Sequence, residues 1–385
     1  MARSSKSPRR VLQIAYQAGC EALPAYSHRF SPKKFTQPQL FACLVLKEFC
    51  KSDYRGIVAF LRDLPELCRD IELTVIPHFT TLQKAAQRLL RIAPARRLLA
   101  ATLRQARRAK IARRRLPLAA LDGTGLESHH ISAYFLQHRR AQEIRQEKYT
   151  RYPKVGLLCD CANHLIAAAV PGRGPGSDSV HYRQALTEAL QIVSIDTLVA
   201  DAGYDSEEAH VYARRILGIR TIIPSTIGRP TAKPPTGYYR RLMRRRFDRQ
   251  KYGQRWQIET VTSMIKRNLG SALRARNYRT QGREIMLRVI AHNIMILRLS
   301  GAFLQSKLTP IPWNCSENIH GRARQNPPPH VWWEHERSHP VAKEKEANPI
   351  TAPWAGTPAG HRHPAGDVTE AATPRNRRRG TGALR

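Results

Sequence analysis

The chain has 385 residues, with 65 Lys and Arg against 29 Asp and Glu, a formal net charge of +36 and an isoelectric point near 10.9. A field of this sign and strength attracts polyanions and favours binding through phosphate contacts. Arginine outnumbers lysine, which suits forked contacts to phosphate oxygens. An excess this large is more than surface solvation requires, so the composition predicts a nucleic-acid partner.

The length allows two or three domains. No run of about 18 apolar residues occurs, which predicts no transmembrane helix. Residues 1–10 are rich in basic side chains, but neither a long apolar segment nor a small-residue cleavage site follows them. They are therefore not expected to be a secretory signal. Seven cysteines are scattered without a Cys-x-x-Cys pair of zinc-ligand spacing. We therefore expect a reduced, cytoplasmic protein with no membrane partner.

The first 115 residues are predicted to be a helical DNA-binding region. Residues 1–35 are basic and contain helix-breaking prolines, so we expect them to be irregular. Residues 39–108 have apolar side chains at helical spacing, and Thr80 is a candidate N-cap for a basic helix. This succession suits a helix-turn-helix reader of the major groove, although a plain helical bundle with a basic face gives the same pattern. The basic run 104–115 is predicted to contact phosphates without reading sequence.

From residue 116 to 300 the pattern alternates between strand and helix. Strands are expected at 116–121, 197–200 and 219–223, with a hairpin of 154–160 and 164–170. Helices are expected at 180–193, 206–217, 247–269 and 284–299. The segment 233–246 is interpreted as a loop in which Arg244 and Arg245 contact phosphates. The order predicts an α/β domain, a mixed sheet with helices packed on it. Residues 301–385 lack periodicity and are predicted to be a disordered tail.

Three acidic residues stand in positions that hold a side chain rigidly. Asp122 and Asp201 each end an apolar strand, and Glu259 lies on a predicted helix. Three converging carboxylates can hold divalent metal ions. Two such ions activate an attacking water or 3′-hydroxyl and stabilise the leaving oxygen of a phosphodiester. Carboxylates without His or Cys predict Mg²⁺, with Mn²⁺ as a substitute.

Glu259 belongs to a set of four residues at helical intervals. Arg255, Glu259 and Lys266 follow Tyr252 by three, seven and fourteen positions, so the four side chains share one face of a helix. A solvated face is the ordinary interpretation of such a set. The two strands that end in aspartate upstream favour a functional one.

These motifs resemble the signature of the bacterial insertion-sequence transposases of the DDE class. The matching segments are Asp-Gly-Thr at 122–124, Asp-Ala-Gly-Tyr-Asp at 201–205 and Tyr-x2-Arg-x3-Glu-x6-Lys at 252–266. The most similar group is the one with the Tyr-Arg-Glu-Lys signature helix. The resemblance implies a ribonuclease H-like core that cleaves DNA and transfers strands at the terminal inverted repeats of the element.

The resemblance also implies residue roles. Asp122, Asp201 and Glu259 would be the catalytic, metal-holding triad, and Tyr252, Arg255 and Lys266 would bind phosphates near the scissile bond. Double-stranded DNA would be the partner, bound by at least a homodimer in the bacterial nucleoid. Two alternatives stay open: a ribonuclease H-like nuclease that cuts without joining, and an inactive DNA-binding protein derived from a transposase.

Other polar residues are given structural interpretations. Asp160 is expected in the hairpin turn, and Asp178 and Asp205 at the starts of helices. Trp256 could stack on a displaced base, but we expect it to be buried. Three histidines are interpreted as loop residues and not as metal ligands: His129, His130 and His138.

Overall fold

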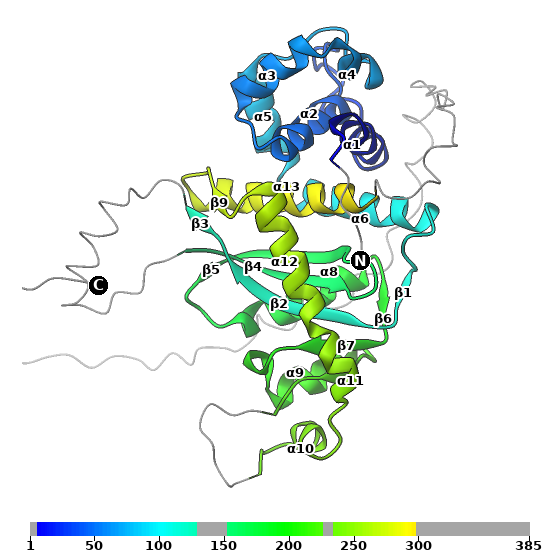
Figure 1. The fold of residues 1–385 in the computed structure, drawn as a ribbon, viewed down its shortest axis with the longest axis vertical. Helices are drawn as coiled ribbons and strands as arrows, with labels where there is room; N and C mark the ends of the chain where they lie inside the picture. The colour runs from blue at the N-terminus through cyan, green and yellow to red at the C-terminus, as the bar shows by residue number, and fades with distance from the viewer. Residues whose placement is uncertain (1–5, 129–151, 226–233, 298–385) are drawn as a thin grey trace, which may run out of the picture. The chain divides into compact units, whose positions relative to one another are not determined.

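The computed structural model describes residues 6–128, 152–225 and 234–297 (Figure 1). Six helices come first along the chain, and they gather on one side of the sheet in Figure 1. Their bounds are α1 Pro8–Ala22, α2 Gln37–Phe49, α3 Tyr54–Asp63, α4 Pro65–Asp70, α5 Phe79–Leu89 and α6 Ile92–Arg108. The helical character predicted for residues 39–108 is confirmed.

Helix α1 corrects the prediction that residues 1–35 are irregular. Ser7 caps the helix by accepting a hydrogen bond from the backbone N–H of Arg10. Val11, Leu12 and Ala15 are fully buried against the other helices. The apolar spacing is helical, and the surrounding basic residues and prolines masked it in the sequence.

The starts of α2 and α5 show how local side chains fix the helix ends. At α2, Thr36 and Gln39 exchange side-chain-to-backbone hydrogen bonds, which forms a capping box. At α5, the predicted cap Thr80 is wrong: His78 is the N-cap, and its Nδ1 accepts from the Thr80 backbone N–H. The helix thus begins two residues earlier than a Thr80 cap would place it.

A five-stranded mixed sheet follows, in the order β5-β4-β2-β7-β8. Strand β4 is antiparallel to β2 and β5, whereas β7 is parallel to both β2 and β8. The strand bounds are β2 Ala119–Gly125, β4 Tyr152–Asp160, β5 Ile166–Gly174, β7 Thr197–Ala200 and β8 Arg220–Ile222. This topology confirms the predicted ribonuclease H-like mixed sheet with N-terminal helices.

Two pairs of short strands extend the fold. Strand β1 (Arg115–Leu116) pairs with β6 (Ser194–Ile195), and β3 (Glu127–Ser128) pairs with β9 (Ala272–Leu273). The predicted strand 116–121 is therefore two strands, because the peptide nitrogen of Pro117 cannot donate to a sheet. The hairpin β4–β5 and the strands β7 and β8 lie where they were predicted.

The helices after β5 are shorter and more broken than predicted. They are η1 Asp178–His181, α8 Tyr182–Leu190, η2 Ala202–Tyr204, α9 Glu207–Val211, η3 Tyr212–Ile216, α10 Tyr238–Arg245, α11 Arg249–Tyr252, η4 Gly253–Arg255, α12 Trp256–Leu269 and α13 Tyr278–Leu297. Two expectations are corrected. Residues 233–246 contain helix α10, and the single helix predicted at 247–269 is α11, a 3₁₀ turn and α12.

Helices cover both faces of the sheet. On one face, α12 crosses β2 and β4 (Figure 1), and Val155 and Leu157 of β4 lie beside Ile265 of α12. On the other face, Gly156 lies so close to η1 that a Cβ there would be 2.8 Å from the Cβ of His181. The glycine allows the start of α8 to pack directly on the sheet.

Helix α13 joins the sheet to the N-terminal helices. Its residues 285–297 are all buried, and it packs against α2 and α6 as well as β4 and β5. Asn293, fully buried, donates to the Ile166 carbonyl and to Thr102 Oγ1, and its Oδ1 accepts from the Ile166 N–H. Arg288 donates to Glu48 of α2 and Glu284 of α13, at 2.8 and 2.7 Å.

Two buried histidines make the stability of the fold dependent on pH. Burial lowers the pKa of both His210 and His292 to about 4. In the unfolded chain each histidine takes up a proton near pH 6.5, so folding is favoured above that pH and loses stability as the pH falls toward 4. Each site contributes a loss of roughly 3 kcal/mol over that window.

We therefore expect the free energy of unfolding, measured with urea, to fall steeply between pH 6.5 and 4. A His292→Asn variant should show a shallower slope over this window, whatever its stability at pH 7.5. The exposed His28 provides the matched control, because His28→Asn should leave the slope unchanged. Identical slopes for all three proteins would contradict the assignment.

The sequence also allows predictions about membrane spans, cysteines and the C-terminal tail. In the described ranges no helix is long and apolar enough to cross a membrane. Six cysteines of these ranges are unpaired, and Cys159 and Cys161 are buried. The predicted disordered tail at 301–385 and the three loop histidines lie outside the described residues. The boundary at residue 115 stays a prediction.

Candidate active site

Asp122 and Asp201 lie side by side, where the parallel pairing of β2 with β7 ends. Leu121 of β2 is in register with Ala200, the last residue of β7, and each aspartate is the next residue along the chain. Contrary to the prediction, Asp122 does not end its strand, because β2 continues to Gly125. In a parallel pair this register directs both carboxylates to the same face of the sheet. The strands before them are buried, which fixes the two side chains with little freedom.

The Asp122 carboxylate is in a region crowded with negative charge. Burial raises its pKa, and the charges of Asp178 and Asp201 raise it further, against the lowering effects of the Gly123 N–H and of Arg255. Asp122 Oδ1 accepts from the Gly123 N–H at 2.8 Å, and Asp201 Oδ1 accepts from the Ala202 N–H at 2.7 Å. The site thus holds carboxylates whose mutual repulsion a cation would relieve.

Arg255 joins the third predicted acid to this pair. The turn η4, which carries Arg255, packs over β2 and β7. One guanidinium nitrogen is 3.6 Å from Asp122 Oδ2, and the other donates to Glu259 Oε1 at 2.5 Å. The Glu259 side chain is 56% exposed. The structure therefore brings Arg255, Glu259 and Asp122 together, with the arginine between the two acids.

The other residues of the signature helix lie at different distances from the carboxylates. Tyr252 packs against Phe247 with ring centroids 4.9 Å apart, and burial together with the Asp201 charge raises its pKa, which Arg255 opposes. Lys266 follows Glu259 by seven residues, about two turns of α12. It lines a small cavity together with Thr124 of β2. The break at η4 turns the predicted single stripe into two adjacent segments.

Asp178 and Tyr204 are parts of the site that the sequence did not indicate. Asp178 is the first residue of η1, after the cap Ser177, and its Oδ1 is 2.6 Å from Nζ of the buried Lys154. A Cβ on Gly123 would be 1.9 Å from the same oxygen, so the glycine makes room for this acid. Tyr204, 2% exposed, has a raised pKa from burial and from the nearby charges of Asp178, Asp122 and Asp201.

The donor chemistry of the site fits a divalent metal ion, although the conformation in the structure is not that of a closed metal site. Within the described ranges, no group of three or more His, Cys, Asp or Glu side chains is arranged to hold a metal ion. Asp122 and Asp201 supply hard carboxylate oxygens side by side, which Mg²⁺ prefers. Glu259, the third acid, instead forms an ion pair with the guanidinium of Arg255.

Several further predictions have clear outcomes. Trp256 is 46% exposed, so the expectation that it is buried was wrong; its ring is open to stacking. Asp205 does not cap α9, which Ser206 does, but pairs with Arg240 through both carboxylate oxygens. Asp160 lies at the hairpin turn as predicted and accepts from the Ala162 N–H.

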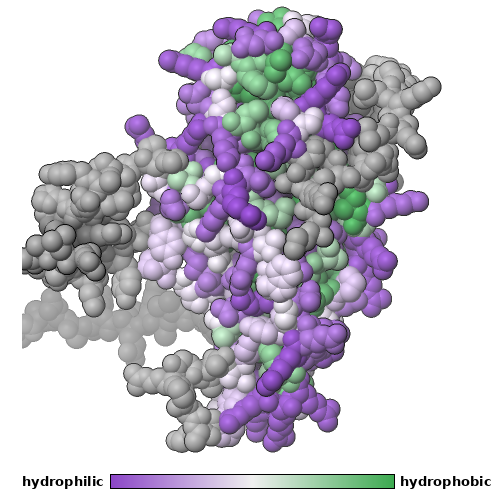
Figure 2. Space-filling model, in the orientation of Figure 1, coloured by the Kyte–Doolittle hydropathy of each residue, from purple (hydrophilic) through white to green (hydrophobic). Residues whose placement is uncertain are grey.

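Arg244 and Arg245, predicted to contact phosphates, lie on the exposed part of helix α10. On the face shown in Figure 2, hydrophilic residues dominate the end of the molecule where α10 lies. Four of the eight residues of this helix are arginines, with Arg240 turned inward to Asp205. The location on a helix, and not on a loop, gives the exposed arginines a fixed spacing.

A comparison with protein families decides what kind of domain this is. Residues 113–294 match the family described as the transposase DDE domain. The chain carries a transposase DDE domain. The matched segment contains the whole five-stranded sheet and the signature helix, together with Asp122, Asp201 and Glu259. This domain implies transposase-like cleavage and strand transfer of DNA. A search of curated proteins gave no match to the chain.

Proposed function

We propose that the chain is the transposase of a bacterial insertion sequence, which cleaves DNA at the inverted repeats of the element and joins the freed strand to target DNA. The observation that carries this proposal is the register of β2 and β7. It sets Asp122 beside Asp201 within the transposase DDE domain, under the turn that leads to Glu259. Metal-assisted chemistry on a phosphodiester needs carboxylates held this close together.

Asp122, Asp201 and Glu259 are the residues that would hold Mg²⁺, or Mn²⁺ in its place. Two such ions, when bound, supply activation of the attacking hydroxyl and charge stabilisation on the leaving oxygen. The protein itself contributes rigid placement of the acids by β2 and β7. It also contributes the Tyr252 and Lys266 side chains, which we assign to phosphates beside the scissile bond.

Arg255 has a specific task in this proposal. In the structure its guanidinium pairs with Glu259 and lies 3.6 Å from Asp122. A DNA phosphate is a tetrahedral anion, and two of its oxygens can accept hydrogen bonds from the same fork of N–H donors. Arrival of the phosphate would draw Arg255 away from Glu259 and leave this carboxylate to face Asp122 and Asp201.

The DNA partner and the remaining parts of the chain follow from the same reaction. We assign the helices of residues 1–115 to binding of the element end, and Arg244 and Arg245 of α10 to backbone phosphates. Because two ends have to be brought together, at least two copies of the chain act in one complex. The bacterial nucleoid is where such a protein would work.

The deciding experiment is a cleavage and joining assay with purified full-length protein and a labelled duplex that carries the element's own end. We expect Mg²⁺-dependent release of a 3′-hydroxyl end and its appearance in joined products, both abolished by EDTA. Cutting without joining would support the nuclease alternative. Binding without cutting in Mg²⁺ or Mn²⁺ would support an inactive DNA-binding derivative. A duplex with a scrambled end is the control.

A further inference from the structure

A hollow lined by arginines lies between α6, the end of α8 and β5. Its volume is about 600 Å³. We call it the arginine hollow, after the five arginines in its wall: Arg96, Arg97, Arg104, Arg107 and Arg114. Leu99, Ala167 and Ile192 supply apolar surface between the charges. Basic side chains of two separate segments, α6 and the connection to β1, thus meet around one space.

The arginine hollow lies at the opposite end of the strands from the carboxylates. Arg114 precedes β1, and Ile192 precedes β6 and β7, so this wall lies at the amino ends of the strands. Asp122 and Asp201 lie just past the other end of the β2–β7 pairing. The hollow is therefore a different place from the candidate active site.

Much of the positive charge in the arginine hollow is not neutralised by the protein. Arg96 pairs with Glu188, and Arg104 pairs with Glu21, which is shared with Arg108. Arg107 donates to the Ile192 carbonyl at 3.0 Å, and Arg97 to the Ala22 carbonyl at 3.3 Å. Arg114 has no ion pair with any described residue. Two carboxylates therefore face five guanidinium groups.

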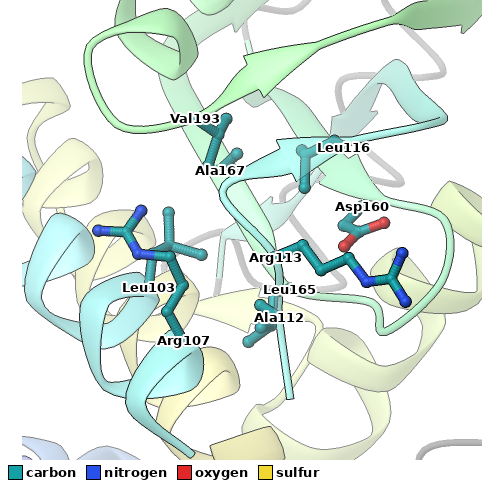
Figure 3. Close-up of a pocket in the computed structure, with 9 residues that line it drawn as sticks. All are labelled: Leu103, Arg107, Ala112, Arg113, Leu116, Asp160, Leu165, Ala167 and Val193. Atoms are coloured by element: carbon teal, nitrogen blue, oxygen red, sulfur yellow. The ribbon is translucent and has the colours of Figure 1, made fainter. Parts of the chain in front are cut away.

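The mutual repulsion of these groups is visible at Arg107. Burial lowers its pKa, and the neighbouring charges of Arg104 and Arg114 lower it further. In Figure 3, Arg107 extends from α6 beside Leu103, and its guanidinium points away from Arg113, which lies across an adjoining small cavity and points toward Asp160. An anion between the arginines would relieve a repulsion that the fold alone leaves in place.

The spacing of the arginines points to a polymeric anion. Arg96 and Arg107 are eleven residues apart on α6, which is about 16 Å along the helix axis. The four arginines of α6 fall within about 100° of its circumference, so they form one row. A single phosphate is too small to contact a row of this length, whereas a nucleic-acid strand presents phosphates all along it.

We propose that the arginine hollow binds the sugar–phosphate backbone of duplex DNA away from the active site, without reading its bases. This inference rests on the proposed function, because it supplies a second hold on the DNA that the transposase acts upon. The row on α6 and Arg114 contact phosphates, and the apolar surface between them excludes water from the contacts. Contacts of this kind position a duplex but carry no sequence information.

The test measures how DNA affinity depends on salt, using fluorescence anisotropy with a random-sequence duplex. The variant Arg97→Gln/Arg114→Gln removes two charges that form no ion pair in the described part of the chain. Each lost phosphate contact lowers the slope of log affinity against log salt by about 0.9, so we expect the slope to fall by roughly 1.8 and affinity to fall at least about tenfold. The variant Arg97→Lys/Arg114→Lys should retain most of the slope.

The matched control is Arg183→Gln/Arg215→Gln, which removes two exposed arginine charges from α8 and η3. An equal fall in slope for this control and for the hollow variant would overturn the proposal, because general charge would explain both. An unchanged slope for the hollow variant, with unchanged melting temperature, would also overturn it. So would stabilisation by inorganic phosphate that the hollow variant loses while its DNA binding stays intact.

The fate of the proposed function is read separately. Mg²⁺-dependent nicking of a short element-end duplex is measured with the wild-type protein alone, so this readout does not depend on the hollow variant. If the wild type does not nick the duplex but the salt slopes differ as expected, the arginine hollow stands and the transposase activity fails. If the wild type nicks the duplex and the slopes are equal, the activity stands and the hollow fails.

Discussion

Changing Glu259 to Gln is expected to lower the rate of Mg²⁺-dependent DNA cleavage by about 10³-fold or more, which corresponds to roughly 4 kcal/mol of lost transition-state stabilisation. The amide is a weaker metal ligand than a carboxylate and carries no negative charge. Because the Glu259 side chain is 56% exposed and its partner Arg255 is near solvent, the substitution should leave folding intact. The loss therefore reports chemistry and not stability.

Two measurements and a control variant separate this expectation from its competitors. Affinity for the element-end duplex, determined in EDTA, should be at or above that of the wild type, because Arg255 is released from its acidic partner. Stabilisation by Mn²⁺ of the protein bound to a non-cleavable element-end duplex, seen as a rise in melting temperature, should be reduced. Glu208→Gln is the matched control, since Glu208 is also an exposed helical acid paired with an arginine. Wild-type cleavage by Glu259→Gln would refute the assigned triad.

Changing Arg288 to Met is expected to remove most of the stability of the protein. Arg288 is 4% exposed, and its guanidinium donates to Glu48, to Glu284 and to the carbonyls of Gly270 and Ala272. Burial alone would raise the pKa of the Glu48 carboxyl. The charges of Lys47 and Arg288 outweigh this effect, so the pKa is lowered. Breaking a buried pair from one side leaves the other charge uncompensated, which costs about 3–5 kcal/mol.

Urea unfolding followed by circular dichroism at pH 7.5 measures this loss. Arg279→Met, at an exposed position of the same helix, is the matched control and should change the free energy of unfolding by no more than about 0.5 kcal/mol. The double variant Glu48→Gln/Arg288→Met should lose less stability than the sum of the two single variants, because the two side chains share one contact. Equal stability of Arg288→Met and Arg279→Met would refute the role given to this contact.

The sequence predicted the strands well, because local signals sufficed. An apolar run that ends in a polar residue identifies both β2 and β7, and the ribonuclease H-like order followed from the motifs. The helices were harder. The apolar residues of α1, such as Val11 and Leu12, were obscured by basic neighbours. The 3₁₀ turn at η4 contains no proline that would have predicted a break in the helix.

The surroundings of the carboxylates could not be predicted, because they depend on contacts between distant segments. Asp178 lies beside Gly123 only because η1 packs against the sheet, and Lys154 reaches it from β4. The interval from Arg255 to Glu259 does allow an ion pair across one helical turn. That Arg255 also approaches Asp122 follows from how η4 lies over β2, which no local pattern encodes.

The burial of α13 has a consequence for how the protein comes into existence on the ribosome. This helix is the last described element, yet it contacts α1, α2 and α6 from the first third of the chain as well as β4 and β5. Neither the early helices nor the sheet can complete its packing until residue 297 has been synthesised. The N-terminal helices and the sheet therefore acquire a complete core at the same late point of synthesis. A message cut short before α13 encodes a fragment whose core is unfinished.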